Sequence, residues 1–326
     1  MSSDTARPVD PSPAEFAGEL PGQVAKRLFH ATRPKFFPAS VLPVLAGTAW
    51  GVQIAGQFDA VLFLLALIAT VCVHAGANVL NDVGDESGGT DRQNTDRIYP
   101  YTGGSRFIQT GILEARSMAR LGISLLTVAA IAGLLLILLK GPMILAFGLA
   151  GVALAVFYSL GPVRLASIGM GELAVAVGLG AIPVVGSAWL QSGAIDNAAI
   201  MFSVPVSAWV AAILLINEVP DIKADEATGK RTLPVRLGHS GTAILYVVIH
   251  LVAAAAFVQM TVSGVMPLLA PVVPIGLLIL AIKSAGAIKK GVADRAGLTA
   301  AIEGTLAIHT IGSIWLVACA LYLFFW

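Results

Sequence analysis

Long apolar runs recur along this chain of 326 residues, and they restrict its fold more than any other feature. Runs of about 18 or more apolar residues are long enough to cross the roughly 30 Å hydrocarbon core of a bilayer as helices. Only 12% of the residues are charged, which is about half of the roughly 25% found in soluble globular domains. We therefore predict an all-α, polytopic membrane protein whose helices form a single bundle.

The distribution of positive charge predicts how this bundle is oriented. If nine helices cross the membrane and the N-terminus is cytoplasmic, all of the 20 Lys and Arg residues except Lys140 fall in cytoplasmic segments. Such asymmetry is typical of membrane proteins, so we predict a multi-pass protein of the cell inner (plasma) membrane whose active-site loops form a cytoplasmic cap. The nine expected spans are residues 37–54, 60–80, 118–139, 143–158, 170–190, 198–216, 243–262, 267–287 and 305–326.

The start of the chain and its net charge set further limits. Residues 1–22 are polar and rich in proline, which predicts a flexible tail before a single membrane domain of residues 23–326. The net charge of +1 gives no support for nucleic-acid binding. The partners that we expect are instead the lipid bilayer and small molecules.

Charged residues gather in two stretches, of which the first spans residues 81–111. Its beginning would extend the second predicted helix, and two glycines then allow a sharp turn. Gly103, Gly104 and Arg106 follow, and they offer backbone N–H groups and a guanidinium, both of which suit phosphate oxygens. The oxygen ligands that this stretch offers to a metal are Asn81, Asp82, Asp85 and Asp91.

The second stretch, residues 217–238, places Asn217, Asp221 and Asp225 four residues apart. On a helix each step of four turns by only about 40°, so all three would line one face. Like charges at this spacing repel, so a cation should lie between them, and Mg²⁺ takes such oxygen ligands together with substrate phosphates. Solvated loops with ordinary salt bridges are the alternative. Two such clusters on one side of the membrane, each preceded by Asn, favour a Mg²⁺ site for a diphosphate ester.

These motifs resemble those of the UbiA superfamily of intramembrane prenyltransferases. Residues 81–91 are similar to the first aspartate motif of that family, and residues 217–225 are similar to the second. Within the family, the chain is most similar to the 1,4-dihydroxy-2-naphthoate prenyltransferases of menaquinone synthesis. The motifs that carry this resemblance are Arg33-Pro34-Lys35, Gly103-Gly104-Ser105-Arg106, Tyr158-Ser159-x-Gly161-Pro162, Gly169-x-Gly171-Glu172 and Gly229-Lys230-Arg231-Thr232-Leu233.

One departure from this resemblance concerns the aromatic acceptor. The menaquinone branch usually has Asn-Asn-x-Arg-Asp at the second motif, whereas this chain has Asn217-Glu218-Val219-Pro220-Asp221. The metal ligands are kept, but the Arg is lost and the proline would kink a helix. Because the positions between the ligands can face the acceptor, other acceptors stay open as alternatives, namely 4-hydroxybenzoate, homogentisate, haem or a lipid.

The resemblance implies Mg²⁺-dependent transfer of a polyprenyl group from polyprenyl diphosphate to an aromatic acceptor. Tyr158 is expected near the reacting groups, with an aromatic anchor at the membrane interface as the alternative. The implied metal ligands are Asn81, Asp82, Asp85, Asp91, Asn217, Asp221 and Asp225; the implied diphosphate contacts are Lys35, Arg106, Lys230, Arg231, Asn81 and Asn217; and the five aspartates with Tyr158 form the implied catalytic set.

A membrane transporter is the alternative from another functional class, because two corresponding halves with charges near a membrane edge also suit a transporter. Against it, the predicted carboxylates cluster at one membrane face rather than at the midplane. The apolar runs themselves carry almost no acidic residues. The enzyme is therefore the favoured hypothesis.

Overall fold

The computed structural model describes residues 10–159 and 163–325, and this described part of the chain is helical and contains no strand. The helices of the bundle are α2 (Pro38–Ala55), α3 (Ala60–Gly88), α5 (Ala115–Lys140), α6 (Met143–Ser159), α7 (Gly171–Val175), α8 (Ile182–Ser192), α9 (Asn197–Asn217), α11 (Leu233–Val262), α12 (Val272–Lys290) and α13 (Arg295–Phe325). The short elements are α1 (Pro21–Ala31), α4 (Thr90–Gln93), α10 (Ile222–Ala227), η1 (Pro13–Phe16), η2 (Pro34–Phe36), η3 (Leu165–Ile168), η4 (Ala176–Ala181) and η5 (Gly291–Asp294).

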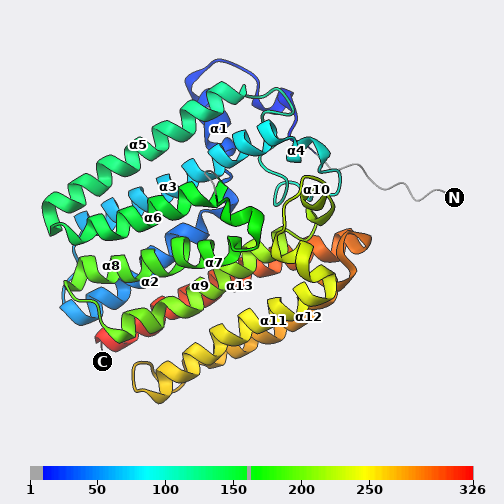
Figure 1. Ribbon diagram of the computed structural model, residues 1–326. Helices are drawn as coiled ribbons and strands as arrows, with labels where there is room; N and C mark the ends of the chain where they lie inside the picture. Colours follow the sequence, from blue (N-terminus) through cyan, green and yellow to red (C-terminus); the bar gives the residue numbers. More distant parts are fainter. Residues whose placement is uncertain (1–9, 160–162, 326) are drawn as a thin grey trace.

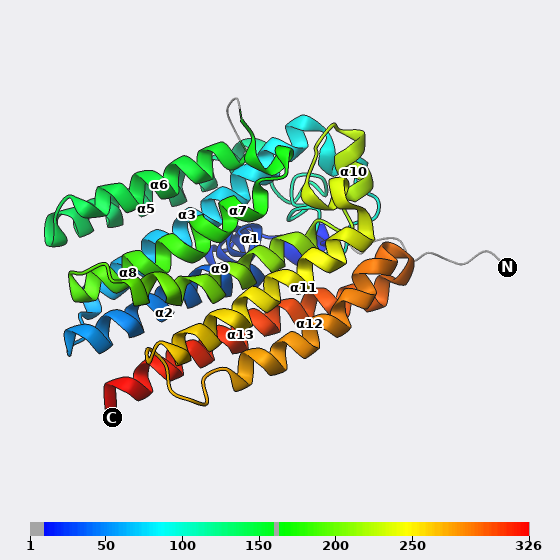
Figure 2. The same ribbon diagram turned by 60° about the horizontal axis from the view of Figure 1, so that its bottom comes forward.

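The long helices lie side by side in one bundle, and α4 and α10 lie together at one end of it (Figure 1). A second view gives the same arrangement, with α3, α5 and α6 on one side of the bundle and α11, α12 and α13 on the other (Figure 2). The connections rich in charged residues gather at the end that carries α10. We call this end the polar end.

Seven segments within the described residues are long and apolar enough to cross a membrane, as predicted for a polytopic protein. One of them, Val272–Leu323, contains most of both α12 and α13, which pack against each other, and α6 is a shorter apolar helix. Large apolar side chains on outward faces stay exposed, such as Leu138 (74% exposed) and Ile244 (63% exposed). Such surfaces suit lipid rather than water. The all-α membrane fold is thus confirmed, and the number of nine spans stays a prediction.

Glycines bring α2 and α8 into close contact. Gly47 and Gly51 lie four residues apart on α2. A Cβ at Gly47 would collide with the carbonyl oxygen of Val184, and a Cβ at Gly51 with that of Ala188. Small residues at this spacing let two backbones approach closely, which is a common basis of helix packing in membranes. This contact holds α8, whose other residues line the second cavity described below, against α2.

The fifth predicted span is not one regular helix. α7 continues through the π-helical turn η4 into α8. At Gly180 in this turn, an added Cβ would collide with Ser207 of α9, so the turn lies directly against its neighbour. π-helical turns occur frequently at functional sites, and Gly178 and Leu179 of this turn line the cavity described below.

Residues 10–18, which belong to the expected flexible tail, pack across the polar end; we call them the N-terminal strap. Asp10 Oδ2 lies 2.6 Å from Nη2 of Arg97, and Asp10 Oδ1 lies 3.6 Å from Nε of Arg106. Phe16 is buried, and its ring centre lies 4.8 Å from that of Phe107. The composition of the tail could not reveal these partners, because they are distant in sequence. Residues 1–9 lie outside the described part, and the division into tail and membrane domain stays a prediction.

We expect Gly47→Ala to destabilise the protein, because the added methyl group meets the backbone of α8, which cannot move aside without shifting the helix. Overpacking of this kind costs about 1–3 kcal/mol. The matched control is Gly276→Ala on α12, where an added Cβ meets nothing within 4 Å. Thermal unfolding of both purified variants in detergent should give a lower midpoint for Gly47→Ala. Equal midpoints would contradict the packing argument.

Candidate active site

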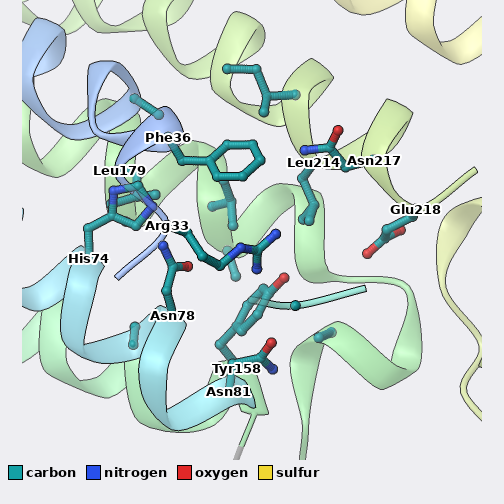
Figure 3. Close-up of a pocket in the computed structure, with 18 of the residues that line it drawn as sticks. Arg33, Phe36, His74, Asn78, Asn81, Tyr158, Leu179, Leu214, Asn217 and Glu218 are labelled. Carbon is teal, nitrogen blue, oxygen red and sulfur yellow. The ribbon is translucent and has the colours of Figure 1, made fainter. Parts of the chain in front are cut away.

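A cavity of about 260 Å³ opens at the polar end, where the two charged stretches meet (Figure 3). α3 continues as far as Gly88 and ends at Gly89, whose backbone is left-handed (φ 76°), so the acidic residues near its end are helical as predicted. The loop of residues 94–104, the end of α9 and α10 complete this part of the wall. Of the predicted site residues, Asn81, Asp85, Tyr158, Asn217, Asp221, Asp225 and Lys230 line this cavity.

Lys230 joins the two charged stretches by ion pairs. Its Nζ lies 3.0 Å from Asp85 Oδ1 and 3.6 Å from Asp225 Oδ1. The three side chains are 23%, 24% and 8% exposed, respectively, so solvent ions screen their attraction less than that of a surface pair. The pairs therefore hold the end of α3 close to α10.

The second charged stretch does not form the continuous helix that its spacing predicted. α9 ends at Asn217, a turn follows, and α10 begins at Ile222. Pro220 lies in the turn, where its ring and its missing N–H disfavour a continued helix. The prediction of a single helix face was therefore wrong, but the turn still brings Asn217, Asp221 and Asp225 to the wall of one cavity.

The loop between α4 and α5 covers the cavity beside α3. Asn94 Nδ2 donates a hydrogen bond to Asp221 Oδ1 (2.7 Å), and the backbone N–H of Ser105 donates one to Asp82 Oδ2 (2.9 Å). Asp82 is 3% exposed and does not line the cavity, whereas Gly103 does. Asp82 thus holds the glycine-containing loop in place, which differs from the metal-binding role that the sequence suggested for it.

Arg33, rather than Lys35, is the basic residue of the Arg33-Pro34-Lys35 motif that lines the cavity. Its backbone is left-handed (φ 61°). Arg33 Nη2 donates a hydrogen bond to the carbonyl oxygen of Tyr101 (3.1 Å), and its guanidinium carbon lies 4.9 Å from the centre of the Phe36 ring. Figure 3 shows the Arg33 side chain inside the cavity. Lys35 instead places its Nζ 4.9 Å from the centre of the Tyr101 ring.

Two other predicted residues have different surroundings. Arg106 pairs with Asp10 of the N-terminal strap, and the backbone N–H of Arg231 donates to the carbonyl oxygen of Ser167 (2.7 Å). Neither Arg106 nor Arg231 lines the cavity. Asp91 belongs to α4, but its side chain lies outside the described part. Polar residues that the sequence analysis did not assign also line the cavity, namely Arg33, His74, Asn78, Asn94, Thr102 and Glu218.

Burial favours protonation of the carboxyl groups in the second stretch. It raises the pKa of Asp221 to about 7 and the pKa of Asp225 to about 6. The hydrogen bond from Asn94 opposes the shift at Asp221, and the charge of Lys230 opposes the shift at Asp225. Burial is the main cause that raises the pKa of Glu218, and the negative charge of Glu172 raises this pKa further. The cavity wall thus has more acidic groups than cations to stabilise their charged forms.

The oxygen atoms of the wall suit a divalent cation that is held together with a phosphate ligand. Within the described residues, no three Asp, Glu, His or Cys side chains form a cluster that could hold a metal ion. Mg²⁺ usually takes one or two carboxylates and completes its octahedral shell with water and phosphate oxygens. Asn217 Oδ1 and Asn94 Oδ1 are buried and have no hydrogen-bond partner among the described residues. Together with Asp85, Asp221 and Asp225, these amide oxygens fit Mg²⁺.

A second cavity of about 700 Å³ continues the first along the bundle. Helices α3, α5, α6 and α8 surround it, and Asn81, Gly151 and Leu179 line both cavities. Its wall is almost entirely apolar and includes Leu149 of α6, which is 60% exposed on the outward surface. A ligand with a charged head and a long apolar tail would fit the two cavities together.

Comparison with known proteins agrees with this geometry. The model of the UbiA prenyltransferase family matches residues 40–297. The chain belongs to the UbiA prenyltransferase family. It is 33% identical over 264 residues to the 1,4-dihydroxy-2-naphthoate octaprenyltransferase of Mycobacterium tuberculosis, which covers 79% of this chain and 85% of the relative. It is 28% identical over 246 residues to the Bacillus subtilis protein of the same name, with 76% of each chain covered. The chain is therefore a prenyltransferase, as the motifs predicted.

Solved UbiA homologues share the fold. A homologue from Archaeoglobus fulgidus bound to GPP and Mg²⁺ superposes with a TM-score of 0.66 at 14% identity, covering 92% of this chain and all of that one (100%). The apo structure of a homologue from Aeropyrum pernix gives a TM-score of 0.62 at 18% identity and covers 86% of this chain and 96% of the other. This likeness supports the helical membrane bundle.

We expect Lys230→Met to destabilise the polar end, because it leaves Asp85 and Asp225 close together without their shared cation. Removing one partner of a fully buried pair costs about 3–5 kcal/mol, and we expect about 2 kcal/mol here because Lys230 is 23% exposed. The matched control is Lys223→Met, whose side chain is 79% exposed beside Asp96. Thermal unfolding at pH 8 should give a lower midpoint for Lys230→Met than for Lys223→Met. Equal losses would show that the Lys230 pairs do not hold the polar end together.

Proposed function

We propose that this prenyltransferase transfers a polyprenyl group from polyprenyl diphosphate to 1,4-dihydroxy-2-naphthoate, with Mg²⁺ as cofactor. The observation that carries the proposal is the joining of the two cavities. A polar cavity lined by carboxylates, amides and Lys230 leads directly into an apolar cavity of about 700 Å³. The diphosphate would lie in the first cavity and the polyprenyl tail in the second. The relatives at 28% and 33% identity support the choice of acceptor.

The residues of the polar cavity have distinct roles in this proposal. Asp85, Asp221, Asp225 and Asn217 would hold Mg²⁺, which supplies positive charge to the diphosphate when it is bound. Lys230 Nζ already lies among these carboxylates, and from this place it can donate to a phosphate oxygen. Positive charge that is in position before the C–O bond breaks stabilises the leaving diphosphate.

Other groups of the polar cavity would orient the diphosphate and so determine where the allylic cation forms. Arg33 and the backbone of Gly103 and Gly104 face the cavity beside the carboxylates, so they can orient the diphosphate. As the C–O bond breaks, its electron pair leaves with the diphosphate, and a ring carbon of the acceptor forms the new C–C bond. The ring then loses a proton, or its carboxylate leaves as CO₂, and the bonding electron pair returns to the ring. The Tyr158 side chain points into this region (Figure 3), where its ring can face the cation.

The proposed orientation places the polar end in the cytoplasm and the bundle in the cell inner membrane. It is supported by the Lys and Arg residues, of which all but Lys140 lie toward one side if nine helices span the membrane. Polyprenyl diphosphate would then enter the apolar cavity from the lipid, and the aromatic acceptor would arrive from the cytoplasm.

We expect Asp85→Asn to reduce prenyl transfer by about 100-fold or more, because it removes a carboxylate from the site of diphosphate departure. The assay measures diphosphate release and prenylated product from purified protein supplied with polyprenyl diphosphate, 1,4-dihydroxy-2-naphthoate and Mg²⁺. Asp96→Asn serves as control, because Asp96 pairs with the exposed Lys223. Activity of Asp85→Asn within a few-fold of the parent protein would refute the proposed role of this carboxylate.

The Mg²⁺ requirement should depend on pH. Protons compete with the metal for carboxylates, and burial raises the pKa of Asp221 to about 7 and the pKa of Asp225 to about 6. Lowering the pH from about 8 to about 6 should therefore raise the Mg²⁺ concentration for half-maximal activity by about tenfold or more. Excess Mg²⁺ at the lower pH should restore the rate. A requirement that stays constant would exclude these two groups as ligands.

A further inference from the structure

One part of the polar cavity is not explained by the diphosphate. Its wall includes apolar side chains of η2 and α9, namely Phe36, Val210, Ile213 and Leu214. None of these four residues lines the larger apolar cavity, so this part of the wall, which we call the side chamber, lies off the proposed path for the polyprenyl tail. A chamber walled by an aromatic ring and branched side chains suits a flat ring.

A single acidic side chain provides a polar group beside this chamber. Glu218 follows α9 directly, is 8% exposed and lines the cavity. Figure 3 shows its carboxyl group pointing toward the cavity next to Leu214. Its Oε2 is buried and has no hydrogen-bond partner among the described residues. A buried carboxyl group with so few partners is unfavourable, so a ligand in the cavity that brings a donor to the Glu218 carboxyl group gains a hydrogen bond.

A second carboxyl group supports Glu218 from behind. Glu172, in the first turn of α7, is 5% exposed and does not line the cavity. The carboxyl groups of Glu172 and Glu218 lie close enough to interact electrostatically, and Oε1 of Glu172, like Oε2 of Glu218, is buried without a hydrogen-bond partner among the described residues. Glu218 Oε1 also lies 3.7 Å from the place that a Cβ on Gly171 would occupy, so the side chain packs against the start of α7. These contacts hold the Glu218 carboxyl group between the start of α7 and the cavity.

We propose that Glu218 accepts a hydrogen bond from a ring hydroxyl of the aromatic acceptor, and that Glu172 positions Glu218 for this contact. The inference rests on the proposed function and makes its acceptor more specific: the ring must carry a free hydroxyl group. A hydroxyl held at Glu218 fixes the ring in the side chamber, with its edge toward the diphosphate. A ring whose hydroxyl is methylated has no donor for the Glu218 carboxyl group.

The test compares the parent protein with Glu218→Ala and Glu218→Gln. Glu218→Ala should raise the KM for 1,4-dihydroxy-2-naphthoate by about tenfold or more, because a buried hydrogen bond is lost. Glu218→Gln keeps an oxygen acceptor, so the KM should stay within about threefold of the parent value. In both variants the KM for polyprenyl diphosphate and the Mg²⁺ requirement should remain within about twofold, because Glu218 contacts neither. Glu226→Ala, an exposed acidic residue of α10, is the control.

A chemical test uses the two monomethyl ethers of the acceptor. The parent protein should use at least one of them with a KM about tenfold above that of the free diol. Glu218→Ala should lose this discrimination, because the partner of the missing donor is also gone. Glu172→Leu should raise the acceptor KM with little change in kcat, and Glu172→Gln should restore it, which a purely structural role would not produce.

Three outcomes would overturn the inference. The first is an acceptor KM in Glu218→Ala that stays within about twofold of the parent value. The second is a Mg²⁺ requirement of Glu218→Ala that rises as much as its acceptor KM, because Glu218 would then be a metal ligand. The third needs no variant and applies even if the substitutions prevent folding: the parent protein uses both methyl ethers as well as the free diol. If the parent protein transfers no polyprenyl group to any aromatic acceptor, the proposed function fails instead.

Discussion

The ion pairs of Lys230 with Asp85 and Asp225 connect two charged stretches, and Lys230 and Asp85 are 145 residues apart in the chain. The other features of the polar end depend on this connection. Carboxylates placed together at the end of an apolar bundle repel one another and lose much of their hydration, so they need a cation between them. Lys230 supplies one positive charge, and the amide of Asn94 supplies a donor to Asp221. The acidic groups still outnumber these partners, which is the electrostatic basis for expecting Mg²⁺ and a basic surrounding for a diphosphate.

Close helix packing gives the polar end its second property, direct access to an apolar cavity. The glycines of α2 allow α8 to approach, and the π-helical turn before α8 brings Gly178 and Leu179 to the wall that the two cavities share. A charged head and a hydrocarbon tail therefore find adjacent sites of opposite character. Glu218 and the apolar side chamber add a third site, and Figure 3 shows Glu218 beside Leu214 and Asn217 of α9. In our proposal, these three sites separate diphosphate, polyprenyl tail and aromatic ring before the reaction joins two of them.

Several site residues could be predicted because their positions depend on local structure alone. Asn81 and Asp85 lie four residues apart near the end of an apolar helix, so helical geometry directs both toward the same side, and both line the cavity. Other residues have partners that are distant in the sequence, and their predicted roles stay predictions. Asp82 is turned toward the backbone of Ser105, and Arg106 pairs with Asp10 of the N-terminal strap. Arg33 entered the cavity in place of Lys35 through a left-handed backbone that the motif did not reveal.

The amino-acid sequence by itself determined that the chain forms a helical membrane bundle with its acidic residues gathered at two places. Hydrocarbon runs and helical spacing depend on neighbouring residues, so they can be read without coordinates. Only the tertiary structure decided which basic side chains face the cavity, that the turn around Pro220 still brings the ligands of the second motif to one wall, and that Glu218 and Glu172 lie together. These features depend on turns and on contacts between segments far apart in the chain, and the direction of a side chain follows from the backbone and the partners around it.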